Sequence, residues 1–168
     1  MVVGLDFSRD LQRDMAMKFR IFLAIAILIL FLFPAPAWAA NQSQILQLKT
    51  TRLCQGCDLA NVYLPIAKLD YIYLLDANLS KANLTGASIS FSNLSRANLR
   101  GANLSYGNFQ RTKMLLADLS DAVLDKANLT EADLTSAIVL ESQLASAKLC
   151  KTILPSGLTS NRDCPVKD

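Results

Sequence analysis

Histidine is absent from the 168-residue chain, and with it the commonest general base and the commonest metal ligand. The chain also lacks the nucleophile motif G-x-S-x-G, the phosphate-binding P-loop and the dinucleotide motif G-x-G-x-x-G. Its formal net charge is only +3, which favours neither nucleic-acid binding nor imitation of a polyanion. We therefore expect no catalytic activity, no cofactor, no metal and no nucleic-acid partner.

A long apolar run is present only near the N-terminus. Residues 21–33 are all apolar, Lys18 and Arg20 precede them, and two prolines follow. This run is too short to span a bilayer, which takes about 20 apolar residues. Ala37-Trp38-Ala39 fits the small-x-small rule for signal-peptide cleavage. We expect residues 1–39 to be a signal peptide with an N-terminal extension, and no membrane attachment after cleavage. The alternative is an uncut membrane anchor.

The extreme N-terminus is unusual for a signal peptide. Asp6, Asp10 and Asp14 dilute the positive charge that this region normally carries. Our hypothesis is that synthesis starts at Met15 or Met17.

The rest of the chain has a strict period of five. A large apolar residue occupies every fifth position from Leu59 to Leu154, twenty in all, and sixteen of them are Leu. The position two residues before each of these is Ala at twelve of the twenty repeats and small at six others, and only Val62 and Ile72 are larger. The residue directly before the large one is often Asn or Asp, as at Asn78 and Asp118. A period of five fits neither the 3.6 of a helix nor the 2 of a strand.

Segments such as Ala77-Asn78-Leu79-Ser80-Lys81 resemble the pentapeptide-repeat family, whose pattern is A-(N/D)-L-x-x. The resemblance implies an all-β fold over residues 57–154, a right-handed quadrilateral β-helix with one repeat on each side. Twenty repeats at four per coil predict about five coils, or roughly 24 Å at the usual strand spacing. The large and the small residue both point inward, so the interior is filled and no cleft is expected.

A β-helix exposes its core and unpaired backbone at both ends, which need covers. We expect an N-terminal cap over residues 40–56, with Ile45, Leu48 and also Leu46 on the apolar side of a short helix. We expect the irregular tail of residues 155–168 to cap the other end.

The four cysteines flank the predicted coils. An even number in an exported chain indicates disulfides. Bridged Cα atoms lie within about 7 Å, far less than the length of the rod, so we predict the pairs Cys54–Cys57 and Cys150–Cys164. The alternative for Cys54-Gln55-Gly56-Cys57 is a redox site, because C-x-x-C is also the thioredoxin motif; the surrounding βαβ pattern of that fold is not visible.

Residues 20 apart stack on one wall of such a coil. A candidate interaction patch therefore consists of Tyr71, Tyr73, Phe91, Arg111 and Lys113. The first four are residue types that are common at binding hot spots. Arg111 over Glu131 and Lys113 over Asp133 would be opposite-charge neighbours. The alternative is that these contacts only stabilise the coils.

We expect a non-catalytic protein-protein interaction or scaffold module in an exported compartment. Its partner is a protein of unknown identity, and a homodimer is a second option. The family resemblance places such exported proteins in the periplasm or the thylakoid lumen. Two alternatives stay open: a DNA mimic that regulates a nucleic-acid enzyme, as some family members do, and a thiol-disulfide redox protein that uses Cys54 and Cys57.

Overall fold

The computed structural model describes residues 37–166, so the start at Met15 or Met17 and most of the expected signal peptide lie outside the described residues. The chain divides into two units, Met1–Ala40 and Asn41–Asp168, and the coils belong to the second. The elements are α2 (Ala37–Thr51), α3 (Glu141–Leu144), β1 (Thr152–Ile153) and β2 (Thr159–Ser160). Among residues 37–166, no helix is both long and apolar enough to cross a membrane.

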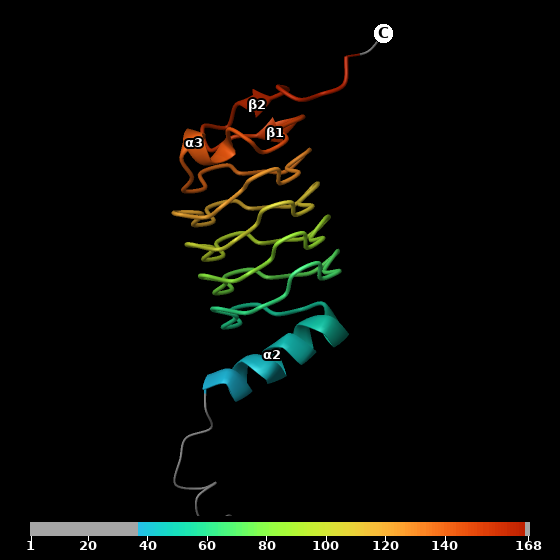
Figure 1. Ribbon diagram of the computed structural model, residues 1–168, viewed down its shortest axis with the longest axis vertical. Coiled ribbons are helices and arrows are strands. Elements are labelled where there is room, and N and C mark those ends of the chain that lie inside the picture. The colour runs from blue at the N-terminus through green and yellow to red at the C-terminus, as the bar shows by residue number, and fades with distance from the viewer. Residues whose placement is uncertain (1–36, 167–168) are drawn as a thin grey trace, which may run out of the picture. The chain divides into compact units, whose positions relative to one another are not determined.

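The second unit is a quadrilateral β-helix, seen as stacked turns in Figure 1. Isolated parallel bridges join residues 20 apart, and the bridging residue is the one before each large apolar residue. Leu79 N–H donates to the Asn98 carbonyl one coil further on at 2.7 Å, and Asn98 N–H donates back to the Ala77 carbonyl at 2.9 Å. One coil therefore contains four repeats, and each repeat contributes one bridge to the ladder on its own side.

From residue 52 to residue 136, each corner has a residue with a positive φ, as a type II turn requires. In one example, Ala82 N–H donates to the Leu79 carbonyl at 3.1 Å, and Lys81 between them has a φ of +56°. The Asn before the large residue stabilises the same turn, because Asn78 Oδ1 accepts the N–H of Ser80 at 3.1 Å. Corner residues of this kind are exposed, which makes the corners the natural contact points of the surface.

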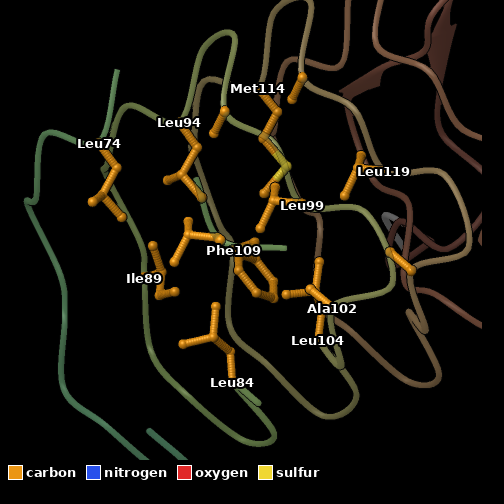
Figure 2. Packing of buried hydrophobic residues seen from close by; sticks show 14 of the residues in the cluster. Leu74, Leu84, Ile89, Leu94, Leu99, Ala102, Leu104, Phe109, Met114 and Leu119 are labelled. Carbon is orange, nitrogen blue, oxygen red and sulfur yellow. The ribbon is translucent and has the colours of Figure 1, made fainter. Parts of the chain in front are cut away.

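The core fills the inside of the coils with side chains from all four walls (Figure 2). All of the predicted large positions are buried except Val139 and Leu154, which pack partly buried against the cluster. Figure 2 shows Leu74, Leu94 and Met114 from successive coils in a row, all directed inward. The small positions are buried as well, except Ala67, which is half-buried, and Ser142, which is exposed.

Four expectations about the ends need correction. The bridges begin at Leu53, not at residue 57, because the disulfide segment already has coil geometry. Helix α2 starts at Ala37 rather than at residue 40. Leu48 is buried and Ile45 packs against the core, but Leu46 is 63% exposed because it points to the opposite side of the helix. The tail is not wholly irregular, since its residues Thr159–Ser160 form β2, which pairs antiparallel with β1.

The repeat pattern also predicts an unbroken last coil, which is wrong. Helix α3 interrupts it at Glu141–Leu144, although Leu144 still points into the core. Here the side chain of Gln143 replaces part of the backbone ladder: its Nε2 donates to the carbonyls of Leu119 at 2.9 Å and Ala122 at 2.7 Å. The last coil is thus closed by a side chain at one wall.

Candidate interaction face

Three of the five predicted patch residues form one continuous column on a corner of the coils. The rings of Tyr71 and Phe91 stack with centroids 5.1 Å apart and an angle of 10° between their planes. The guanidinium of Arg111 lies over the Phe91 ring, 5.2 Å from its centroid. Tyr71 is 69% and Phe91 43% exposed. The structure therefore brings an aromatic pair and a cation together on the surface.

Arg111 is also held from the other side. Its Nε lies 2.7 Å from Oε2 of Glu131, the next residue in the column. The hydrogen bond from Arg111 holds the pKa of the Glu131 carboxyl below its usual value, and Glu131 in turn raises the pKa of Arg111. Both side chains remain partly exposed, so the pair orients the guanidinium more than it stabilises the fold.

The other two patch residues are not in contact with each other. Tyr73 and Lys113 lie on the neighbouring bridge column, with Asn93 between them. Tyr73 is half-buried, whereas Lys113 is exposed. Asp133 is one coil from Lys113, but its Oδ1 accepts the N–H of Thr135 at 3.0 Å and the Thr135 hydroxyl. The Lys113–Asp133 ion pair that the spacing suggested does not form among the described residues.

Other corners carry contacts that we did not predict. Arg96 binds Asp76 at 2.6 Å, and the hydrogen bond from Arg96 lowers the pKa of the Asp76 carboxyl. Lys126 lies over the Tyr106 ring at 5.4 Å. Both pairs are 20 residues apart, so the rule that found the Tyr71 column could also have found them. Tyr63 and Ile66 are 73% and 79% exposed on the first coil, where no periodicity marks them.

Both cysteine pairs have their sulfur atoms at bonding distance. Cys54 and Cys57 have their Cα atoms 5.3 Å apart, and Cys150 and Cys164 have theirs 4.6 Å apart. The side chain of Cys54 is fully buried and that of Cys57 nearly so, beneath α2. Burial keeps solution thiols away from these sulfurs, which favours a structural bridge over a redox site.

The surface is not free of hollows, contrary to our expectation for a filled rod. One of about 450 Å³ is lined by residues of α2 and the first coil. Another of about 450 Å³ is lined by residues of the last coil, α3 and the tail. Both arise at the ends, where the caps do not match the outline of the square coils. Among residues 37–166, no three His, Cys, Asp or Glu side chains form a metal-binding group.

Several solved structures of pentapeptide-repeat proteins are similar to this chain. HetL from the cyanobacterium Nostoc sp. strain PCC 7120, a pentapeptide-repeat protein involved in regulating heterocyst differentiation, is 28% identical with a TM-score of 0.53; the match covers 64% of this chain and 53% of HetL. The chain thus spans about half the length of HetL. Rfr23 from Cyanothece 51142 is 24% identical with a TM-score of 0.38, over 73% of this chain and 96% of Rfr23. A protein of the Arabidopsis thaliana thylakoid lumen is 24% identical with a TM-score of 0.29, over 58% and 75% of the two chains.

No curated protein sequence matches the chain. The family described as pentapeptide repeats (8 copies) matches four overlapping segments: residues 57–90, 77–115, 102–139 and 116–154. Together these segments cover residues 57–154, the same range as the period-five pattern, and members of this family fold as right-handed quadrilateral β-helices. The chain belongs to the pentapeptide-repeat family.

Proposed function

We propose that this chain is an exported, non-catalytic scaffold protein that binds another protein through the face formed by Tyr71, Tyr73, Phe91, Arg111 and Lys113. The observation that carries the proposal is the stacked pair of Tyr71 and Phe91. Both rings are exposed to solvent, although the residues two positions earlier in the chain are buried in the core. Aromatic residues and Arg are enriched at the centres of protein interfaces.

The backbone beneath this face supports the proposal. The coils that carry Phe91 and Arg111 have ladder hydrogen bonds to both neighbouring coils, and the first coil, which carries Tyr71, has them to the next coil. A partner would therefore meet a surface that is already ordered. A preformed surface binds with a smaller loss of conformational entropy. Glu131 and Phe91 also hold the Arg111 guanidinium in place.

Export is part of the proposal and rests on the sequence of residues 21–39, with the periplasm or thylakoid lumen as the compartment. The two disulfides support it, because such bonds persist in oxidising compartments. We propose structural bridges rather than thiol-disulfide chemistry, since Cys54 is buried. Residues 57–154 carry nine Lys or Arg and nine Asp or Glu; this balance gives no support to the alternative of a DNA mimic.

A capture experiment tests the binding face. The tagged protein is exposed to periplasmic and lumenal fractions of its native organism, beside the variant Tyr71→Ser/Phe91→Ser. A matched control, Tyr106→Ser/Leu116→Ser, removes two exposed apolar side chains from other corners. We expect the captured partner to be lost with the Tyr71/Phe91 variant and kept with the control. Equal capture by all three proteins would show that the aromatic column is not the binding face.

A further inference from the structure

Figure 1 shows α2 against the first coil at the N-terminal end of the coils. A hollow at this end is lined by Lys49, Arg52 and residues 63–65 and 67–69. Its apolar wall is formed by Tyr63, Leu64, Pro65 and Leu69, together with the half-buried Ala67. Its charged lining consists of Lys49 at the end of α2, Arg52 just after the helix, and Lys68 on the first coil. The hollow therefore combines three cations with an apolar wall, and no acidic residue lines it.

The three cations of this hollow form no ion pair with a carboxylate among the described residues, a property that they share with Lys81 and Lys113. Within residues 37–166, the ion pairs join Arg96 to Asp76, Arg100 to Asp121, Arg111 to Glu131 and Arg162 to Asp163. None of them uses Lys49, Arg52 or Lys68. Three positive charges thus lie together at a site whose lining contains no carboxylate. Asp70, which is outside this lining, interacts electrostatically with Arg52.

Arg52 is fixed by the backbone, not by an acid. Its Nη1 donates to the carbonyls of Lys68 at 3.4 Å and Asp70 at 3.3 Å. The Asp70 carboxylate is engaged elsewhere, because its Oδ1 accepts the hydroxyl of Ser88 at 2.6 Å and the N–H of Ser90 at 2.9 Å. The guanidinium is therefore positioned before any ligand arrives and keeps donors available.

The distribution of charge along the second unit also favours an acidic partner at this end. Residues 41–115 contain eight Lys or Arg and three Asp or Glu, a net charge of +5, whereas residues 116–168 contain five and eight, a net charge of −3. An acidic partner is therefore attracted to the half that contains both this hollow and the Tyr71 column.

We propose that this hollow binds an acidic segment of the partner protein, in which carboxylates alternate with apolar side chains. Carboxylates match Lys49, Arg52 and Lys68, and an apolar side chain fits beside Tyr63 and Pro65. A concave site of about 450 Å³ admits side chains, whereas a flat bilayer surface cannot enter it. The inference rests on the proposed function and adds the chemistry of the partner.

Binding of a defined peptide tests the site in the exported protein as purified. The probe is a short fluorescein-labelled peptide that alternates glutamate with phenylalanine, measured by fluorescence anisotropy at physiological ionic strength. Lys49→Gln/Lys68→Gln removes two charges from the hollow. Lys81→Gln/Arg100→Gln removes two exposed charges from the same half, outside both the hollow and the Tyr71 face. We expect the hollow variant to raise the Kd about tenfold and the matched control less than about twofold.

Three outcomes would overturn the inference. The first is equal weakening in both variants, which would show attraction by net charge alone. The second is equal binding of a peptide with glutamine in place of glutamate. The third is that the peptide does not bind, whereas the protein adsorbs to vesicles of anionic phospholipid and Lys49→Gln/Lys68→Gln abolishes this adsorption. None of these outcomes affects the capture experiment, in which the Tyr71→Ser/Phe91→Ser variant tests the binding face. The two proposals can therefore fail separately.

Discussion

Gly107 and Phe109 fill the interior of their coil in an unusual way. Phe109 is the largest fully buried side chain, and it occupies a position that holds Leu in most repeats. Two residues earlier, where most repeats have Ala, the chain has Gly. A Cβ at Gly107 would collide with Phe109 Cε2 and come 2.9 Å from the Leu104 carbonyl oxygen. The absence of this one carbon makes room for the ring.

This pairing predicts strong coupling between the two positions. Gly107→Ala alone should lower the free energy of unfolding by about 1–3 kcal/mol, because it overpacks a filled core. In the Phe109→Leu background the same change should cost much less, since Ala with Leu is the ordinary combination of the repeat. Urea unfolding of the two single variants and the double variant measures the coupling. Additive free energies would show that the ring does not set the tolerance at Gly107.

Corner residues show why some features could not be read from the sequence. The outward positions of the repeat contain Lys, Arg, Tyr, Phe and Ile, none of which favours a left-handed backbone. Yet Ile66, Tyr71 and Lys81 all have φ between +56° and +60°. The turn requires this φ at each corner from residue 52 to residue 136, and the cooperative ladder outweighs the local preference of these residues. The inward positions, by contrast, were predictable, because they must be apolar or small whatever the turn does.

At the scale of elements, the middle coils were predictable and the two ends were not. A coil with neighbours on both sides has one arrangement that pairs all its backbone groups, and the period of five defines it. The last coil has a neighbour on one side only, so a local helix competes with the ladder, as α3 shows. The column of Tyr71, Phe91 and Arg111 was predictable from the spacing of 20. The hollow beside α2 was not, because it depends on how a cap of unrelated sequence meets the first coil.

Gln143 provides a test of how the last coil is held. Its Nε2 donates to the carbonyls of Leu119 and Ala122, and its Oε1 accepts the N–H of Leu140 at 2.8 Å. Gln143→Glu removes the donor and places a carboxylate oxygen against two carbonyls, so we expect a loss of about 1–3 kcal/mol in the free energy of unfolding at neutral pH. The same substitution at the corner residue Gln110 should cost less than about 0.5 kcal/mol.

Hydrogen exchange locates the effect of Gln143→Glu. Amides in residues 139–150 should exchange faster than in the unmodified protein, whereas those of the middle coils should not change, because each coil contacts only its neighbours. Unchanged exchange in this segment, with full stability, would mean that the Gln143 amide does not hold the last coil.

At the scale of the whole molecule, the ionisable side chains determine how stability depends on pH. The chain has no histidine, and its four cysteines are paired, so no side chain with an ordinary pKa near neutrality remains. Several carboxyls have a lowered pKa. Burial disfavours the charged form of Asp70, but hydrogen bonds from Ser88 and Ser90 outweigh it and lower the pKa. The side-chain hydrogen bond from Ser120 lowers the pKa of Asp118, and the Leu149 N–H does the same for Asp163.

These directions determine how stability should depend on pH. A carboxyl whose pKa is lower in the folded state binds fewer protons there than in the unfolded chain, so it stabilises the fold above its ordinary pKa. That contribution disappears as the pH falls through the folded pKa, below the ordinary values of 3.8 for Asp and 4.5 for Glu. We therefore expect a thermal midpoint that is flat between about pH 5 and pH 8 and falls steadily below about pH 4. Circular dichroism melts of the oxidised protein across this range measure it. A midpoint that already drops between pH 8 and pH 6 would contradict the argument, because no side chain assigned here changes its charge in that interval.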